Sequence, residues 1–161
     1  MAGLEPWITL KRNLNECRNL FSDSSFEKFF VSVGGRFAGF LIIDMRGAFA
    51  GYIKAICVAP EFRGKGVGRA IIRFAEQRIF SESPDVFLCV SSFNRNAKRF
   101  YLRLGYKVIG ELKDYVIKGS SEILMRKSIG SKSGFKAKNY LFPAGLRDKK
   151  GTFGIKRPPL F

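Results

Sequence analysis

The chain of 161 residues is 46% hydrophobic, which suits one domain with its own core. It contains no histidine, which excludes Ser-His-Asp and Cys-His nucleophiles and most transition-metal sites. Its three cysteines are odd in number and widely spaced, which argues against disulfides and zinc, so no metal is expected. The net charge of +16 favours polyanionic or acidic partners. The sequence shows neither a long apolar run nor a secretory signal, which predicts a soluble, cytoplasmic protein without membrane contact.

The first half of the chain is expected to form one helix and three strands. The helix is predicted over Asn13 to Phe21, where apolar residues recur at helix spacing. The strands are predicted at Lys28 to Val33, Arg36 to Ile43 and Tyr52 to Val58. The pair Gly34-Gly35 between the first two strands suits a tight hairpin turn, because glycine adopts positive φ without strain.

Helices and strands then alternate. An apolar stripe predicts a helix over Val67 to Ile79, and an apolar run predicts a buried strand at Val86 to Val90. A helix over Asn94 to Leu104 and strands at Tyr106 to Leu112 and Ile123 to Arg126 complete the order. This order describes an α/β fold in which helices pack on a mixed sheet, without internal repeats.

The composition changes after Gly130. Residues 131–161 hold eight Lys or Arg against one acid, and their Ser, Gly, Lys and Pro show no sustained period. We therefore expect a folded domain over residues 1–130 and a basic C-terminal extension containing Gly, Lys and Phe over residues 131–161, extended or partly disordered. The charge of this extension makes contact with a polyanion an open partner prediction.

Glycines and basic residues gather between the third strand and the second helix. The segment reads Val58-Ala59-Pro60-Glu61-Phe62-Arg63-Gly64-Lys65-Gly66-Val67-Gly68-Arg69-Ala70. A P-loop would need Ser or Thr after Gly64-Lys65, and a dinucleotide fingerprint would need glycine in place of Arg69, so neither motif fits. Glycines let backbone amides approach an anion closely. The positive end of the helix dipole and the charges of Arg63, Lys65 and Arg69 attract that anion. A pyrophosphate is the expected ligand.

Two motifs resemble one family. Arg63-x-x-Gly66-x-Gly68 resembles the pyrophosphate signature of the GNAT superfamily of N-acetyltransferases, Arg or Gln-x-x-Gly-x-Gly or Ala. Residues Asn94 to Tyr106 resemble its next segment, in which Asn opens a helix and Tyr precedes a Leu-Gly-Phe or Leu-Gly-Tyr turn. The resemblance covers about residues 5–127. It implies a mixed, mostly antiparallel sheet flanked by helices, with a V-shaped gap between the strand ending near Val58 and the strand Val86 to Val90.

The resemblance also implies which residues hold acetyl-CoA and act in the reaction. The pantetheine arm would pair with strand amides, as an added strand does. The residues implied in binding are Ile56, Val58, Arg63, Gly64, Lys65, Gly66, Val67, Gly68, Arg69, Asn94 and Tyr101. The amide of Val58 would stabilise the oxyanion, and the hydroxyl of Tyr101 would protonate the departing sulfur.

The general base stays open at this stage. Relatives that acetylate protein N-termini often place Glu second in a strand tetrad matching Leu88-Cys89-Val90-Ser91, and Cys89 stands there in this sequence. A neutral thiol in an apolar strand is a poor base and usually a small buried hydrophobe. The other candidates, acting directly or through water, are Glu61, Asp44, Tyr52, Asp114 and Tyr115. Glu5 and Trp7 either line the acceptor cleft or, as we favour, pack at the start of the first helix.

Two functions are compatible with these observations. The first is direct transfer of an acetyl group from acetyl-CoA to a primary amine of a protein N-terminus, a lysine or a small molecule. The second is an acyl-CoA-binding or nucleic-acid- or ribosome-associated module that uses its basic surface without turnover, since aromatic residues interleave with cations in the extension. A cationic antibiotic acceptor is disfavoured by the dispersed acids. Monomer and dimer are both open.

Overall fold

A computed structural model describes residues 13–137, 145–147 and 153–158 of the chain. The chain divides into two compact units, which are described separately. Unit 1 comprises residues up to Ser24 together with Phe87–Lys127, and unit 2 comprises Ser25–Val86 together with residues from Ser128 onward. Within the described ranges, no helix is long and apolar enough to cross a membrane. Glu5 and Trp7 lie outside the described residues.

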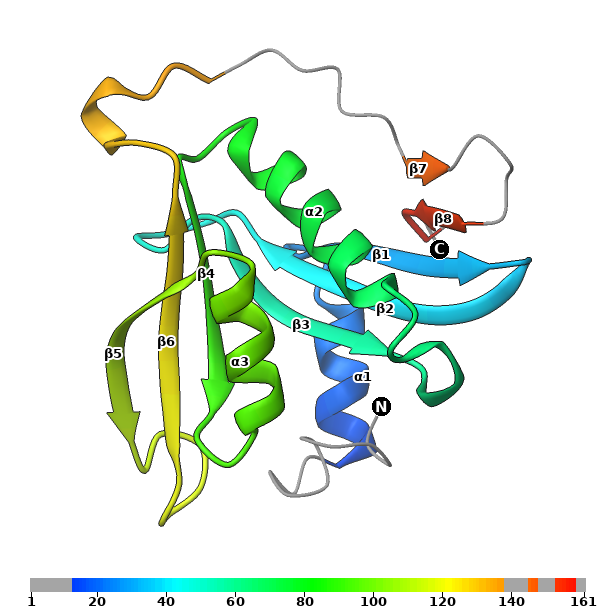
Figure 1. Ribbon diagram of the computed structural model, residues 1–161, viewed down its shortest axis with the longest axis horizontal. Coiled ribbons are helices and arrows are strands. Elements are labelled where there is room, and N and C mark those ends of the chain that lie inside the picture. The colour runs from blue at the N-terminus through cyan, green and yellow to red at the C-terminus, as the bar shows by residue number, and fades with distance from the viewer. Residues whose placement is uncertain (1–12, 138–144, 148–152, 159–161) are drawn as a thin grey trace. The chain divides into compact units, whose positions relative to one another are not determined.

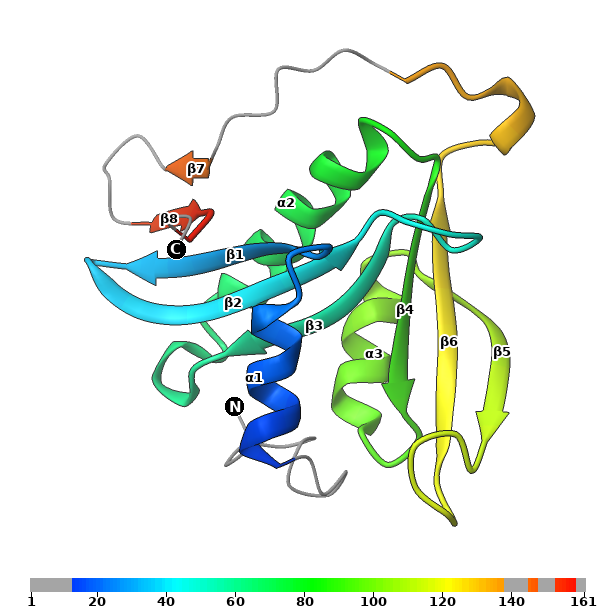
Figure 2. The ribbon, with the colours of Figure 1, turned by 180° about the vertical axis from the view of Figure 1, so that it is seen from behind.

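Unit 2 is built on an antiparallel meander. Its strands are β1 (Glu27–Val33), β2 (Arg36–Asp44) and β3 (Tyr52–Val58), seen from two sides in Figures 1 and 2. The turn between β1 and β2 places Gly34 at φ +57° and Gly35 at φ +74°. These positive angles confirm the predicted glycine hairpin, because two consecutive positive φ angles match the right-handed twist of paired strands.

The basic extension adds two strands to this sheet. These are β7 (Gly145–Arg147) and β8 (Phe153–Lys156), and β8 pairs with β1 so that Ile155 faces Val31. The side chain of Ile155 is fully buried. Phe153–Lys156 is thus extended, one of the two predicted possibilities, and strand hydrogen bonds and an apolar contact, which the sequence did not predict, fix it to β1. The domain boundary at residue 130 stays a prediction.

Helix α2 (Val67–Phe80) lies against the meander of unit 2 (Figure 1). Its apolar stripe supplies Ile71, Phe74 and Ile79 to the core, and the Phe74 ring meets the Phe29 ring of β1 edge to face at 4.9 Å between centroids. The 3.6-residue period of the stripe therefore sets which side of the helix faces the sheet. A short helix η1 (Pro60–Phe62) lies between β3 and α2, and η2 (Lys132–Gly134) follows residue 128.

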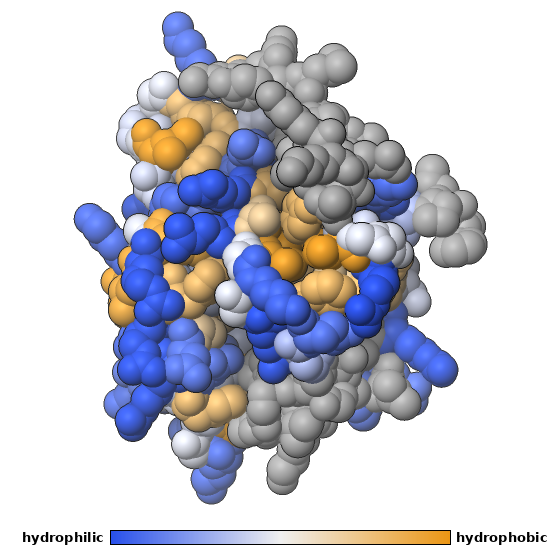
Figure 3. All heavy atoms as spheres, turned by 45° about the vertical axis from the view of Figure 1, so that its right-hand side comes forward, coloured by the Kyte–Doolittle hydropathy of each residue, from blue (hydrophilic) through white to orange (hydrophobic). Residues whose placement is uncertain are grey.

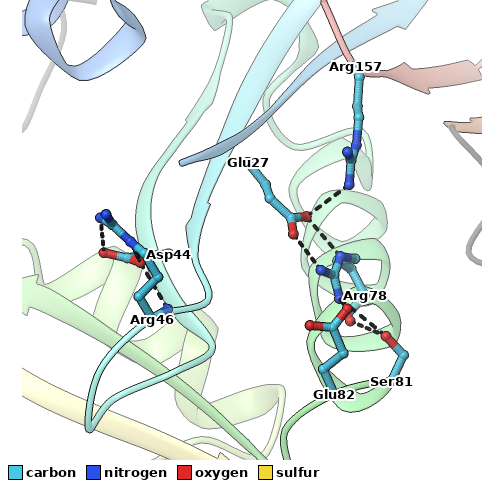
Figure 4. A network of polar contacts seen from close by, with 7 residues as sticks. All are labelled: Glu27, Asp44, Arg46, Arg78, Ser81, Glu82 and Arg157. Carbon is cyan, nitrogen blue, oxygen red and sulfur yellow. Dashed lines mark hydrogen bonds and ion pairs between the residues drawn. The ribbon is translucent and has the colours of Figure 1, made fainter. Parts of the chain in front are cut away.

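A buried arginine joins α2, β1 and the extension (Figure 4). Arg78 pairs with Glu27 of β1, pairs with Glu82 at 2.7 Å and reaches the hydroxyl of Ser81 at 3.3 Å. Arg157, directly after β8, donates to the same Glu27 carboxylate at 3.3 Å. Because Arg78 and Glu27 are both largely buried, removing either one would leave the other charge buried without this partner, so the pair holds α2 against β1.

Truncation of Ile155 to alanine is expected to destabilise unit 2. Ile155→Ala removes a fully buried side chain and leaves a cavity beside β1, so the free energy of unfolding should fall by about 3 kcal/mol. Urea unfolding followed by circular dichroism measures this change. Lys156→Ala is the matched control, because Lys156 is the exposed neighbour in the same strand. Equal stability of wild type and Ile155→Ala would show that β8 does not belong to the folded core.

Unit 1 combines two helices with three strands. Helix α1 (Leu14–Ser22) begins with a capping box, in which the Asn13 side chain accepts from the Glu16 amide and the Glu16 side chain accepts from the Asn13 amide. The remaining elements are β4 (Asp85–Ser91), α3 (Arg95–Arg103), β5 (Lys107–Lys113) and β6 (Ser121–Ser128). Strand β6 pairs antiparallel with β5 and has β4 on its other side.

All predicted helices and strands are present, so the predicted α/β class with a mostly antiparallel sheet and flanking helices is confirmed. The last predicted strand begins at Ser121 instead of Ile123, which brings Glu122 into β6. The predicted third helix begins at Arg95, because Asn94 is its cap. The V-shaped gap concerns strands assigned to different units and stays a prediction.

Candidate functional site

The glycine-rich loop of unit 2 follows β3 and ends at the start of α2. Gly64 has φ +71°, and Gly66 has φ +82° and is the N-cap residue of α2. Both angles lie in the left-handed region, which L-residues with a side chain rarely adopt, so glycine is required at both positions. The buried side chains of Phe62 and Val67 hold the two ends of the loop, while its middle is exposed.

The start of α2 offers backbone amides to an anion. A Cβ atom built on Gly64 or Gly66 would meet no atom within 4 Å, so the backbone is open to an approaching ligand. The first bond within the helix runs from the Ala70 amide to the Gly66 carbonyl at 3.1 Å, and no side chain of the described residues caps the helix. The amides that precede Ala70 and the positive end of the helix dipole therefore suit a phosphate group.

Cationic side chains surround these amides. Arg63, Lys65 and Arg69 are all exposed. Hydrophilic residues also cover much of the face drawn in Figure 3, with apolar residues exposed among them. The Nε of Arg63 donates to the carbonyl of Val58 at 3.1 Å, which ties the loop to the end of β3. The guanidinium is thereby held at the strand end, where its charge adds to the field of the helix start.

The backbone of β3 presents two amides on the side opposite β2. The Ala59 amide donates to the carbonyl of Ala38 at 2.9 Å, and the register pairs Val58 with Gly39. Hydrogen-bonded and non-hydrogen-bonded pairs alternate along an antiparallel ladder. The N–H groups of Val58 and Ile56 consequently point away from β2. The predicted roles require this orientation, because the Val58 amide would have to reach an oxyanion and the Ile56 backbone would have to pair with a pantetheine arm.

Gly39 is needed for this arrangement. A Cβ atom at Gly39 would lie 2.1 Å from the carbonyl oxygen of Cys57, far below any normal contact. Only glycine therefore allows β2 to approach β3 closely at this point.

Asn94 of unit 1 is held at the junction of β4 and α3. Its side-chain oxygen accepts from the Ala97 amide at 3.1 Å and so caps α3. Its own amide donates to the carbonyl of Ser91, the last residue of β4, at 2.8 Å. The structure thus gives Asn94 a capping role, and the predicted contact with acetyl-CoA would use the remaining side-chain amide group.

Tyr101 points into the core of unit 1 from α3. It is 7% exposed, and its ring meets the rings of Phe100 and Tyr106 edge to face, at 5.2 Å and 5.6 Å between centroids. Burial raises the pKa of Tyr101 above its usual range. The hydroxyl therefore keeps its proton at neutral pH, as a proton donor must.

Two of the predicted base candidates are already paired with arginine. Asp44 accepts from the Arg46 side chain at 3.0 Å and 3.2 Å and from the Arg46 amide at 3.0 Å (Figure 4). The hydrogen bond from the Arg46 side chain lowers the pKa of Asp44, which makes this carboxylate a weaker base. Glu61 forms an exposed ion pair with Arg36 at 3.5 Å.

The remaining candidates are less suited to catalysis. Asp114 has φ +53°, and its carboxylate accepts from the Gly119 amide at 2.6 Å, so it shapes the turn between β5 and β6. Tyr115 is 68% exposed. Tyr52 is half-buried in β3, opposite Asp44. Cys89 is half-buried in β4, so the expectation of a small buried side chain is only partly met.

A buried carboxylate in unit 1 was not among the sequence-based candidates. Glu122 of β6 accepts a 2.6 Å hydrogen bond from the hydroxyl of Ser91. The signal in the sequence was weak: Glu122 directly precedes the apolar run Ile123 to Met125, and carboxylates are rarely buried. It was missed because the strand was predicted to begin at Ile123.

The predicted site residues therefore form two local groups. Within unit 2 the loop and helix start bring together Arg63, Gly64, Lys65, Gly66, Val67, Gly68 and Arg69, next to Ile56 and Val58 on β3. Unit 1 holds Asn94 and Tyr101 on α3. Among the described residues, no cluster of three His, Cys, Asp or Glu side chains could hold a metal. The assignment of each residue to acetyl-CoA stays a prediction.

Known proteins resemble this chain in sequence and fold. The model of the Acetyltransferase (GNAT) family matches residues 4–106. An uncharacterized N-acetyltransferase of Methanocaldococcus jannaschii, MJ1530, is 33% identical over 102 residues. That match covers 62% of this chain and 65% of the relative, so the chain spans less than two thirds of that protein.

Two solved structures share the fold. The ribosomal-protein-S18-alanine N-acetyltransferase of Escherichia coli has a TM-score of 0.63 and 19% identity, over 78% of this chain and 80% of that one. A Bacillus anthracis protein described as a streptothricin acetyltransferase, in complex with acetyl coenzyme A, has a TM-score of 0.62 and 19% identity, over 70% of this chain and 68% of that one. At these identities the likeness shows the fold alone.

Proposed function

Because the chain belongs to the GNAT acetyltransferase family and is therefore an acyltransferase, we propose that it transfers the acetyl group of acetyl-CoA directly to a primary amine. The amine belongs to a protein N-terminus, a lysine or a small molecule. The transfer takes place in the cytoplasm and needs no metal.

The observation that carries this proposal is the loop at the start of α2. Two glycines in the left-handed region open the backbone, α2 begins without a side-chain cap among the described residues, and three exposed cations lie on the loop and the first turn. This combination binds a pyrophosphate, because amides, helix dipole and cations all favour negative charge. Acetyl-CoA carries a pyrophosphate beside its adenosine, which fits these residues.

The remaining roles follow from the needs of the reaction. The amine nitrogen forms a bond to the thioester carbon, the carbonyl oxygen becomes negative, and the C–S bond then breaks. The Val58 amide stabilises the negative oxygen, and Ile56 pairs with the pantetheine arm. The Tyr101 hydroxyl gives its proton to the sulfur and regains one from solvent.

The acceptor class is proposed from charge and from the relatives. One structural neighbour is named as an enzyme for the alanine of ribosomal protein S18, which makes peptide N-termini the first class to test. The net charge of +16 repels strongly cationic acceptors and favours neutral or acidic ones. Peptides with neutral or acidic residues after the N-terminal amine are therefore expected to react faster than polyamines.

A screen of acceptors tests the proposed function. The full chain is mixed with acetyl-CoA and, in turn, with peptides starting with Ala, Ser or Met, with Nα-blocked lysine peptides and with spermidine. Release of free thiol is recorded and acetylated products are identified by mass spectrometry. We expect turnover with at least one peptide amine. Acetyl-CoA binding by calorimetry without turnover in any arm would instead support the binding module.

A further inference from the structure

Two neighbouring aromatic rings are exposed on the sheet of unit 2. Phe30 of β1 is 39% exposed and Phe37 of β2 is 58% exposed, and their rings meet edge to face at 6.2 Å between centroids. Apolar side chains scattered singly over a surface are normal, whereas large apolar groups that gather at one place often mark a binding site. The proposed transfer reaction gives neither ring a role.

Both rings lie on the side of the sheet away from α2. Side chains alternate along a strand, and Phe29, next to Phe30, contacts Phe74 of α2, so Phe30 points to the opposite side. In Figure 2, where β1 and β2 lie in front of α2, this side is turned toward the viewer. Ser32 shares the side of Phe30, and the strand register pairs Ser32 with Phe37. Residues paired across two strands share a side, which places the two rings together.

Lysines border the two rings on the same side. Lys156 of β8 is exposed and pairs with Phe30 in the register, so their side chains lie next to each other. Lys28 lies two residues before Phe30 on β1 and is half-buried. Gly154 of β8, which pairs with Ser32, adds no side chain to this side. The rings therefore have one cation beside them on β8 and another along β1.

The acids of these strands are paired with arginine. The strands β1, β2 and β8 contain two acids, Glu27 and Asp44. Glu27 pairs with Arg78 of α2, and Asp44 pairs with Arg46 at 3.0 Å. Together with the net charge of +16, the lysines therefore favour an anionic occupant. A second copy of the chain is disfavoured, because it would bring like charges together.

We infer that the aromatic face, formed by Phe30, Phe37, Lys28 and Lys156, binds single-stranded nucleic acid. Unpaired bases stack on the two rings, since every base has a planar face that stacks on an aromatic side chain. The two lysines contact the phosphates of the same strand. A duplex keeps its bases inside the helix and cannot use the rings in this way. This binding activity does not depend on the proposed acetyl transfer.

Fluorescence anisotropy with a labelled oligonucleotide tests the inference. The full chain is titrated into fluorescein-labelled oligouridine at physiological salt, and we expect a dissociation constant below about 100 µM. Phe37→Ala should raise this constant at least about fivefold, because one stacked base is lost. Phe49→Ala is the matched control and should keep wild-type affinity, because Phe49 is 51% exposed but lies between β2 and β3, outside the aromatic face.

A lysine variant tests the contact with the phosphates. Lys156→Gln should weaken binding and reduce the slope of log affinity against log salt by about 0.7, the contribution of one phosphate contact on a single strand. Lys107→Gln, at an exposed position of β5 in unit 1, removes the same charge and should leave the slope nearly unchanged. Urea unfolding monitors the fold of each variant. Phe37→Leu, which keeps apolar bulk without a ring, should lose affinity as Phe37→Ala does.

Different results would overturn the inference in different ways. A wild type that does not bind the oligonucleotide would refute it outright, and equal affinities of Phe37→Ala, Phe37→Leu and Phe49→Ala would remove the rings from the site. Equal affinity for oligouridine and for its duplex with oligoadenosine would leave charge alone as the cause of binding. Binding to phosphatidylserine vesicles without binding to the oligonucleotide would assign the aromatic face to a membrane surface. Dimerisation that Phe37→Ala abolishes, again without oligonucleotide binding, would assign it to a second copy.

Discussion

Gly66→Glu is expected to abolish acetyl-CoA binding. The new side chain would occupy the open space in front of the α2 amides, and its negative charge would repel the pyrophosphate. Loss of two amide hydrogen bonds to a charged group costs more than about 3 kcal/mol, which corresponds to a dissociation constant raised by more than about 100-fold. Isothermal calorimetry with acetyl-CoA measures the constant for wild type and variant.

Two further variants isolate the cause of this loss. Gly66→Ala imposes the same backbone strain at φ +82° without the charge, so it should weaken binding far less. Gly119→Glu places a glutamate at a glycine with φ +84° and open surroundings in unit 1, and it should leave binding unchanged. Wild-type binding should also weaken as salt rises, because cations at the loop attract the phosphates. Normal affinity in Gly66→Glu would remove the loop from the acetyl-CoA site.

Tyr101→Phe is expected to lower turnover by about 100-fold while leaving acetyl-CoA affinity close to wild type. The variant keeps the ring that packs against Phe100 and Tyr106 and removes only the hydroxyl. The thiolate would then have to leave without a proton donor, which raises the barrier of that step alone. Steady-state rates and calorimetry on the same preparations measure both quantities.

Cys89→Ala is the contrasting variant for Tyr101→Phe. Direct transfer gives Cys89 no covalent role, so Cys89→Ala should lower stability and keep turnover. An inactive Cys89→Ala protein that binds acetyl-CoA normally, together with an acetylated wild-type enzyme in the mass spectrum, would instead establish transfer through a thioester on the protein.

The pH dependence of stability checks the environment of Tyr101. In the unfolded chain a tyrosine ionises near its ordinary pKa of about 10, whereas burial raises the pKa of Tyr101 in the folded protein. Above pH 10 the unfolded state therefore releases this proton first, and the free energy of unfolding falls as the pH rises further. Urea unfolding at pH 9 and pH 10.5 measures this fall in the free energy of unfolding. Between these two pH values the free energy of unfolding should fall less for Tyr101→Phe than for wild type.

The helices and strands, and the glycine-rich loop before α2, could be predicted from the sequence. Hydrophobic spacing predicted α2 to within one residue of its observed end, since a helix must turn its apolar side to a core. The loop was recognisable from its glycines and basic residues, and Gly64 and Gly66 adopt the positive φ angles that favour glycine. Local conformation and local charge are properties of neighbouring residues, so they can be predicted from them.

Contacts between residues far apart in the sequence could not be predicted from it. Residues 153–156 carry too short an apolar pattern to predict a strand, and only hydrogen bonding to β1 defines β8. The ion pair between Glu61 and Arg36 could not be predicted, because Arg36 lies 25 residues away in the sequence. Ser91 and Glu122 are 31 residues apart and come within 2.6 Å because β4 and β6 are adjacent strands. Strand adjacency depends on the packing of the whole sheet, which periodicity within one strand does not specify.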